Sequence, residues 1–181
     1  MNKFKIFLPP TLCIFVLYFI QDYFLYYPLA FGLIIGFANW NSHKYKLFIG
    51  IILSVLSSYI SFFIGYFSIG FIIEIVDSIY NYISEDAKGR IAFIIAPFII
   101  SPLILFLLYT FVFKIPKTRL TAFIIIFAFV LLISQSYFFY YIDSFSINSS
   151  NTKILNPYTM WQIIMALAIQ LLVSQKIKKT I

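Results

Sequence analysis

Long apolar runs, separated by short polar stretches, make up most of this chain of 181 residues. A helix that crosses a bilayer needs about 20 mostly apolar residues, with about 17–25 as the usual range. Six runs approach or reach this length: residues 6–20, 23–38, 47–70, 91–113, 120–142 and 158–174. Their continuous apolar character excludes the alternating pattern of a membrane barrel. The sequence therefore predicts an all-α membrane protein, a single domain over residues 1–181 built as a bundle of about six transmembrane helices.

The first two runs are short and contain proline. Residues 6–20 include Pro9 and Pro10, residues 23–38 include Pro28, and only two polar residues separate the runs. Proline removes a backbone donor and interrupts helices. These runs therefore form either two full spans or a re-entrant hairpin, and both alternatives return the chain to the same side of the membrane.

The third run is longer than a bilayer requires. A helix from Leu47 to Val76 would be about 45 Å long, whereas the hydrocarbon core is about 30 Å thick. Over residues 71–85 the apolar and polar positions separate onto two helical faces, and Glu74, Asp77 and Glu85 share the polar face. We therefore expect a bend at Gly70, an amphipathic helix over about 71–85 in the outer interface, and a turn over residues 87–90.

Charge is scarce and unevenly placed. Only 10% of residues are charged, against about 25% in average soluble domains, so lipid must surround most of the chain. Ten of the thirteen Lys and Arg residues fall on one side of the predicted spans: Lys3, Lys5, Lys44, Lys46, Lys114, Lys117, Arg119, Lys176, Lys178 and Lys179. All six acidic residues fall on the other side, with Lys88, Arg90 and Lys153: Asp22, Glu74, Asp77, Glu85, Asp86 and Asp143.

This asymmetry predicts an orientation. The positive-inside rule places both termini in the cytoplasm, and we expect a multi-pass protein of the plasma (inner) membrane. The basic balance then serves orientation and contact with lipid headgroups, and nucleic acid is not an expected partner.

Small residues suggest where helices pack closely. The second run has Gly32 and Gly36 at the spacing of a helix-packing motif. The third run carries small residues at steps of three or four: Gly50, Ser54, Ser57, Ser58, Ser61 and Gly65. This stripe is interpreted as the central packing seam of the bundle or, alternatively, as a weakly polar path for a small solute.

Other features indicate possible ligand or partner contacts. Pro97 and Pro102 predict a kinked fourth span that is either structural or part of a binding site. Gln135, Gln162 and Gln170 are uncharged polar groups in or near the last two spans, and we expect them to face the bundle or a partner helix. Tyrosines gather near the predicted outer ends, as an interfacial belt or as an aromatic vestibule for a ligand: Tyr18, Tyr23, Tyr26, Tyr27, Tyr66, Tyr80, Tyr82, Tyr137, Tyr140, Tyr141 and Tyr158.

Evidence for catalysis is weak. The acidic residues Glu74, Asp77 and Glu85 are interpreted as a solvated face, with a divalent-cation or basic-partner site as the alternative. The lone His43 is expected to be solvent-exposed, and Cys13 to be a buried apolar side chain. Neither a nucleophile motif nor a metal-ligand cluster occurs, and the predicted spans lack a central ionisable group. We expect no cofactor, no metal and no enzymatic activity.

These features favour a non-enzymatic protein that binds a membrane-protein partner, a second copy of itself, or a small apolar solute. One alternative is a transport component with a cavity between the kinked fourth span and the Ser and Gln faces. A second is an immunity protein that blocks a pore-forming toxin, and a third is an enzyme that uses Glu74 and Asp77.

Overall fold

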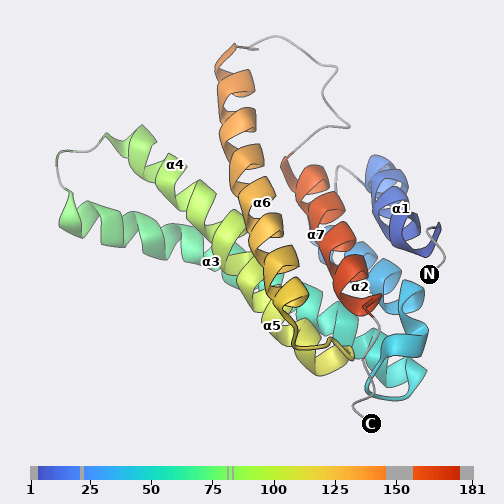
Figure 1. Cartoon of the computed structure of the whole chain (residues 1–181). Helices are drawn as coiled ribbons and strands as arrows, with labels where there is room; N and C mark the ends of the chain where they lie inside the picture. Colours follow the sequence, from blue (N-terminus) through green and yellow to red (C-terminus); the bar gives the residue numbers. More distant parts are fainter. Residues whose placement is uncertain (1–3, 21–22, 81, 83, 146–156, 176–181) are drawn as a thin grey trace.

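The computed structural model describes residues 4–20, 23–80, 82, 84–145 and 157–175, and these residues are almost entirely helical. Its elements, shown in Figure 1, are α1 (Phe4–Ile20), η1 (Phe24–Tyr26), α2 (Tyr27–Ala38), η2 (Trp40–Ser42), α3 (Leu47–Ile79), α4 (Glu85–Ile95), η3 (Ala96–Ile100), α5 (Ser101–Val112), α6 (Arg119–Phe145) and α7 (Pro157–Val173). The segment η3 is π-helical and joins α4 to α5 without a break, so these three elements form one long helix. The all-α prediction is confirmed.

Three helices in the described part of the chain are long and apolar enough to cross a membrane. They cover Leu47–Ile79, Glu85–Val112 and Arg119–Phe138. Three further apolar helices are shorter, over Ile6–Ile20, Phe24–Ala38 and Pro157–Val173. Pro9 and Pro10 lie inside α1, which continues through them, and Pro28 lies in the first turn of α2, where its missing N–H costs no helical hydrogen bond.

The expected bend at Gly70 and the separate helix over residues 71–85 are wrong. Helix α3 continues through Gly70 to Ile79, and the next helix, α4, begins at Glu85. The reason is that the apolar face over residues 69–76 is covered by protein. Ile72 packs with Ala92 and Ala96 in a second, smaller core, flanked by Ile69, Ile73, Val76, Ile91, Ile95 and Ile100.

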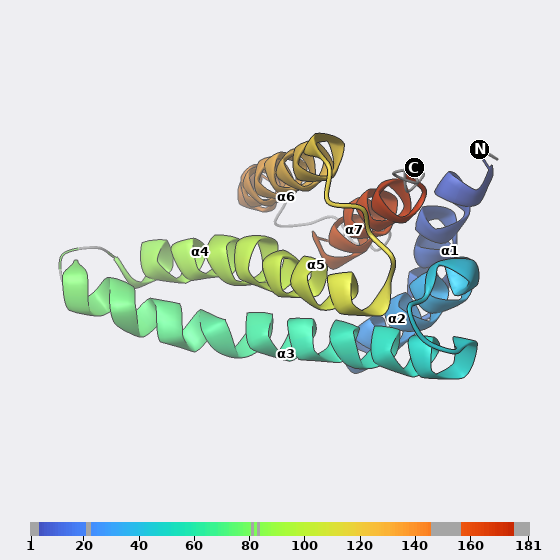
Figure 2. The ribbon, with the colours of Figure 1, turned by 60° about the horizontal axis from the view of Figure 1, so that its bottom comes forward.

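The turn expected at residues 87–90 is also wrong, because α4 begins earlier. Ser84 caps this helix by accepting a hydrogen bond from the Ala87 N–H (3.4 Å), and Glu85 and Asp86 occupy its first turn. Both acidic side chains are favourable there because the N-terminal end of a helix carries partial positive charge. Helices α3 and α4–α5 consequently form a long antiparallel pair, which Figure 2 shows lengthwise.

The remaining helices pack around one main core. Helix α2 packs on α3, α1 on α2 and α7, and α6 on α7. The core contains side chains from six elements, among them Cys13, Phe31, Tyr109, Leu132 and Ile169. Cys13 is fully buried with a free thiol, as predicted.

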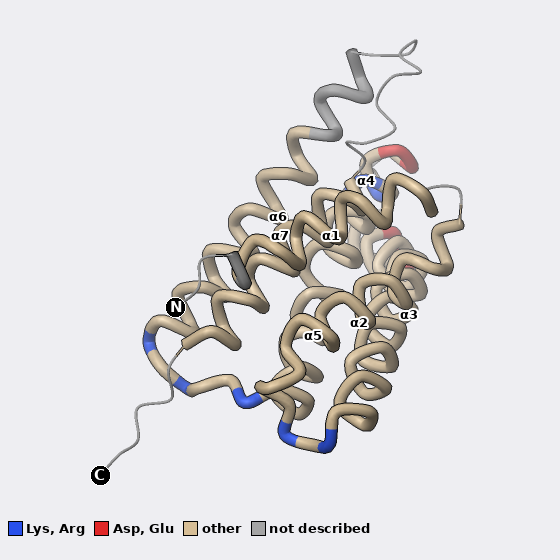
Figure 3. Tube along the Cα trace, turned by 90° about the vertical axis from the view of Figure 1, so that its right-hand side faces the viewer, with Lys and Arg blue, Asp and Glu red and all other residues tan. Residues whose placement is uncertain are grey.

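Charges separate to opposite ends of this arrangement. Figure 3 shows basic residues in the α2–α3 and α5–α6 connections, and acidic residues at the far end of α3 and α4. Lys44, Lys46, Lys114, Lys117 and Arg119 are the basic residues concerned. Of the other residues on the predicted basic side, Lys5 lies in α1, whereas Lys3, Lys176, Lys178 and Lys179 lie outside the described residues, as do Asp22 and Lys153.

Candidate functional site

A cavity of about 80 Å³ lies between α2, α3, η3 and α7. A cavity needs only about 10–15 Å³ to hold one water, so this one has room for several waters or for part of a small solute. Eight of its fifteen lining residues are aromatic: Phe24, Tyr27, Phe31, Phe62, Tyr66, Phe98, Tyr158 and Trp161. The others are Pro28, Ser58, Gly65, Ile69, Pro97, Ser101 and Gln162.

Side-chain exposure gives the cavity a direction. One set of lining residues, here called the floor, is buried: Phe31, Ser58, Phe98, Ser101 and Gln162. A second set, called the rim, is exposed: Phe24 at 48%, Tyr66 at 56% and Tyr158 at 41%. The cavity therefore leads from an accessible aromatic rim to a protected floor, a shape typical of small-molecule sites.

The serine stripe of α3 supports one side of the floor. The Ser54 hydroxyl donates to the Tyr109 hydroxyl (3.1 Å), and the Ser58 hydroxyl donates to the Ser54 carbonyl (3.0 Å). The Tyr109 and Ser58 hydroxyls are 3.0 Å apart, and the Tyr109 hydroxyl also donates to the Ser54 carbonyl (3.4 Å). This closed ring of hydrogen bonds ties α3 to α5 and holds Ser58 in one orientation.

A second polar contact lies one turn further along α3. The Ser61 hydroxyl donates to the Ser101 carbonyl (2.7 Å), and the two hydroxyl oxygens are 2.9 Å apart. Gly65 lies above this contact, where an added Cβ would be 2.8 Å from the Ser101 Cβ. The absence of a side chain at Gly65 therefore allows α3 and α5 to approach closely beside the cavity.

The two prolines of the fourth span produce the π-helical wall of the cavity. The Ser101 N–H donates to the Ala96 carbonyl, five residues back. In that register the Pro97 carbonyl would accept from residue 102, but Pro102 has no N–H. The Trp161 indole N–H donates to the Pro97 carbonyl instead (2.8 Å). The carbonyl left without a backbone donor by Pro102 thus receives a hydrogen bond from a side chain of α7.

Gln162 is the most unusual group of the floor. Its side-chain N–H donates to the Tyr27 carbonyl (3.3 Å), and a carbonyl can only accept, which sets the orientation of the amide. Its amide oxygen is buried and has no hydrogen-bond partner among the described residues. A buried unpaired acceptor costs about 1–3 kcal/mol, so this oxygen lowers the stability of the packed helices.

The cavity includes only part of the set of predicted contact residues. Pro97 and Gln162 line it, whereas Ser54, Ser57, Ser61, Pro102, Gln135 and Gln170 do not. Ser54, Ser57 and Ser61 are buried between helices, Pro102 is buried at the start of α5, and Gln170 is buried in α7. Gln135 donates to the Pro157 carbonyl (2.7 Å) and links α6 to α7.

Most aromatic lining residues were not singled out from the sequence. Tyr27, Tyr66 and Tyr158 belong to the tyrosine set for which a vestibule was one interpretation. Phe31, Phe98 and Trp161 had no comparable signal, because an aromatic residue in an apolar run is equally compatible with lipid contact. Their identification requires the helix packing.

The glycines of α2 lie against α3. A Cβ at Gly32 would be 2.6 Å from the Val55 Cα, and one at Gly36 would be 3.3 Å from the Ile51 Cα. A Cβ at Gly50 would collide with the His43 ring.

The expectation that His43 is solvent-exposed is wrong. The residue is buried, with 5% of its surface accessible. Its Nε2 donates to the Gly36 carbonyl (2.9 Å), and its ring stacks on Phe113 at 4.8 Å between centroids. The connections around it are paired: the Lys44 N–H donates to the Val112 carbonyl and the Lys114 N–H to the Ser42 carbonyl, both at 2.9 Å. Gly50 provides the space for the ring.

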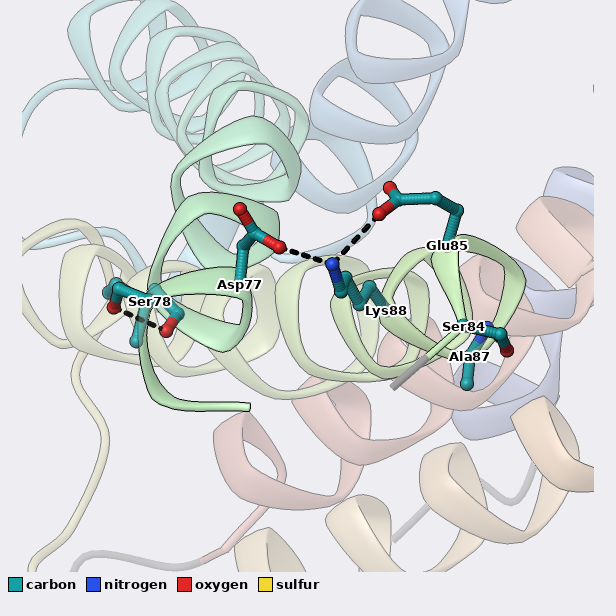
Figure 4. A network of polar contacts seen from close by, with 7 residues as sticks. Asp77, Ser78, Ser84, Glu85, Ala87 and Lys88 are labelled. Atoms are coloured by element: carbon teal, nitrogen blue, oxygen red, sulfur yellow. Dashed lines mark hydrogen bonds and ion pairs between the residues drawn. The ribbon is translucent and has the colours of Figure 1, made fainter. Parts of the chain in front are cut away.

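The acidic face predicted around Glu74, Asp77 and Glu85 is partly engaged in an ion pair. Figure 4 shows Lys88 of α4 between Asp77 of α3 and Glu85, with the Glu85 contact at 2.8 Å. Lys88 is buried whereas both carboxylates remain largely exposed. Asp77 is exposed, as predicted, and in addition its contact with Lys88 links the ends of two helices. In the described part of the chain no group of three or more His, Cys, Asp or Glu side chains could hold a metal ion.

Comparisons of the chain with protein-family models, with curated proteins and with solved structures find no match.

Proposed function

We propose that this protein is a non-enzymatic, multi-pass membrane protein that binds a small, largely apolar solute in the aromatic cavity. The observation that carries the proposal is the cavity itself, with its exposed rim and its buried floor of aromatic and polar groups. A mostly apolar lining with a few placed polar groups is the usual composition of such sites. Burial of the solute's apolar surface would provide the affinity.

The character of the lining supports binding without catalysis. Among the described residues that line the cavity, none is a Lys, Arg, His, Asp, Glu or Cys. Its serine hydroxyls need an adjacent base to become nucleophiles, and each is instead hydrogen-bonded to another hydroxyl or to a carbonyl. These groups are suited to recognition.

The proposal includes an orientation in the plasma (inner) membrane, with six crossings and both termini in the cytoplasm. It is supported by the basic α2–α3 and α5–α6 connections and by the acidic residues at the opposite ends of α3 and α4 (Figure 3). Two rim residues lie at the start of an element: Phe24 begins η1, and Tyr158 is the second residue of α7. The third, Tyr66, lies in the half of α3 that is remote from the basic α2–α3 connection. The cavity would therefore receive its solute from the outer side.

A second form of the proposal is a transport component, and one observation favours it. The wall of the cavity is a π-helical segment, and such segments occur frequently at functional sites. A change of this segment to α-helical register would move Pro97 and Phe98, which line the cavity. Uptake of the bound solute by cells that produce the protein would distinguish transport from binding alone.

The test uses Trp161 as a reporter of binding. Replacing the exposed Trp40 by Phe leaves Trp161, which lines the cavity, as the single tryptophan. Titration of this protein with toluene in mild detergent should change Trp161 fluorescence to saturation. Ile69→Phe would fill part of the cavity and should weaken binding at least tenfold, because the larger side chain takes the volume that the solute needs.

Ile73→Phe is the matched control, since Ile73 is also partly buried against the smaller core but does not line the cavity. It should bind toluene like the parent protein. A response that never saturates, or equal weakening by both variants, would contradict the proposed function.

A further inference from the structure

Aromatic rings dominate the lining of the cavity more than an apolar site requires. Eight of the fifteen lining residues are aromatic, against 22% of the whole chain. Ile69 is the single branched aliphatic side chain among the described lining residues, although such side chains are abundant in the sequence. Aliphatic side chains would bury an apolar solute equally well, so the preference for aromatic rings indicates a ligand that interacts with their faces.

The lining rings are inclined to one another. Four pairs of them are in contact, with ring centroids 5.6–6.5 Å apart: Phe24–Phe62, Phe24–Tyr66, Tyr27–Tyr158 and Phe31–Trp161. The ring planes of these four pairs meet at 41–64°. Stacked rings would cover each other's faces, whereas inclined rings leave faces open to a third group. The face of an aromatic ring is its negative part and attracts a cation.

Three of these rings form the accessible rim, and contacts connect them. Phe24 contacts Tyr66, and Tyr158 contacts Tyr27. The Tyr158 hydroxyl is also near enough to the Tyr66 hydroxyl for the two to interact electrostatically. All three rim residues are at least 41% exposed, so a cation held between them keeps part of its hydration. This limits the cost of removing the charge from water.

The charges in and around the cavity favour a cation without N–H donors. A primary ammonium has three donors and needs a carboxylate or several acceptors when it leaves water, and the described lining residues include no carboxylate. A methylated ammonium needs none. The far ends of α3 and α4 carry four acidic residues against two basic ones (Figure 3): Glu74, Asp77, Glu85 and Asp86, with Lys88 and Arg90. This excess of negative charge favours the arrival of cations from that side.

We propose that the rim of the cavity is an aromatic cage for a methylated ammonium group, of the chemical class of choline and other quaternary ammonium compounds. The cage residues are Phe24, Tyr66 and Tyr158. The inference rests on the proposed function and names the solute class of the same cavity. A quaternary ammonium carries its charge beneath methyl groups, so its outer surface is apolar, and attraction to ring faces is the interaction by which proteins recognise it.

The experiment compares choline with its neutral carbon analogue, in which a carbon atom replaces the nitrogen. Both are titrated into the Trp40→Phe protein in a nonionic maltoside detergent and monitored by Trp161 fluorescence. The free concentration of the neutral analogue is determined by dialysis against protein-free micelles. We expect choline to bind at least about tenfold more tightly, because two or three ring faces each favour the cation. Equal affinities, or tighter binding of the neutral analogue, would overturn the inference.

A variant at the rim tests the contribution of one ring. Tyr66→Leu should lower the ratio of choline affinity to analogue affinity by about 3- to 10-fold, because it removes one ring face. Tyr66→Phe keeps the ring without the hydroxyl and should leave the ratio unchanged. Phe67→Leu is the matched control, since Phe67 is an exposed aromatic residue of α3 that does not line the cavity. An equal fall of the ratio in Tyr66→Leu and Phe67→Leu would contradict the cage.

The outcomes separate this inference from the proposed function, for which toluene is the probe. Saturation with toluene but not with choline would leave the proposed function standing and overturn this inference. If neither probe saturates, both fail.

A methylated ammonium group occurs in free solutes and in lipid headgroups, and one further titration distinguishes these sources. Choline is titrated into the protein in nanodiscs of phosphatidylglycerol, with and without phosphatidylcholine. Weaker binding of choline in the presence of phosphatidylcholine would support a lipid headgroup as the occupant of the cage. Unchanged binding would support a free solute.

Discussion

Replacement of Gly32 by Ala tests whether direct backbone contact holds α2 against α3. The added Cβ would be 2.6 Å from the Val55 Cα, 3.0 Å from the Val55 N and 3.1 Å from the Ser54 O, all backbone atoms. Ordinary contact begins at 3.4 Å, so the helices must separate by about 0.8 Å at this point. Overpacking of this kind costs about 1–3 kcal/mol.

Gly36→Ala is the matched comparison, one turn further along α2. Its added Cβ would be 3.3 Å from the Ile51 Cα, which requires a shift of only about a tenth of an ångström. Both substitutions gain about 1 kcal/mol of intrinsic helix propensity, so this gain cancels between them. We therefore expect Gly32→Ala to be less stable than Gly36→Ala by about 1–3 kcal/mol.

The assay is reversible unfolding of the purified protein in mixed micelles with increasing sodium dodecyl sulfate, monitored by tryptophan fluorescence. Val55→Ala in the Gly32→Ala background should not restore stability, because the crowded atoms of Val55 belong to its backbone. Equal stability of the two alanine variants, or full recovery with Val55→Ala, would refute the packing argument.

Two further predictions concern polar contacts between helices. Tyr109→Phe should lower the free energy of unfolding by about 1 kcal/mol, because the hydroxyl joins Ser54 and Ser58 in a buried site. In the same micelle assay, the control Tyr45→Phe, at an exposed position, should be neutral. An unchanged unfolding midpoint for Tyr109→Phe would contradict the role of these hydrogen bonds. Lys88→Met should increase backbone hydrogen exchange over residues 72–79, because Lys88 joins α4 to Asp77 of α3. The control Arg90→Met removes an exposed ion pair with Asp86 within α4 and should leave this exchange unchanged. Equal exchange in the two variants would count against the helix-linking role of Lys88.

Apolar runs in the sequence predicted the helices well, but their ends depended on contacts that no local pattern contains. Residues 71–79 have an apolar face on Ile72 and Val76, and lipid could have covered it. In the structure Ala92 and Ala96 of α4 cover that face, so α3 continues. The start of α4 could have been recognised locally, because Ser84, Glu85 and Asp86 form a typical helix N-terminus.

His43 illustrates the same limit at the other end of the bundle. A lone histidine beside Lys44 in a polar loop is usually exposed, and its burial depends on three distant groups. Phe113 stacks on the ring, the Gly36 carbonyl accepts its proton, and Gly50 leaves room for it. These residues come from three different parts of the chain, and their proximity is a property of the packed helices.

The cavity was only partly predictable. Pro97 stood out as a helix-breaking residue and Gln162 as a polar one in apolar surroundings, and the tyrosines suggested an aromatic vestibule. The remaining aromatic lining did not stand out, because Phe31, Phe98 and Trp161 occur in runs where any large apolar residue is expected. Pro102 was noticed for the right reason but does not line the cavity, since it acts by removing the donor that the Pro97 carbonyl would otherwise use.

From the sequence alone, a lipid environment and an all-α fold were predictable, because hydrophobic length and scarce charge depend only on composition and order along the chain. The sequence also identified the small residues at which helices can approach closely. The choice of helix faces that pack against each other emerged from the folded chain, because protein and lipid surroundings favour the same apolar side chains. For the same reason, the cavity and the unpaired oxygen of Gln162 became visible only once the helices were placed together.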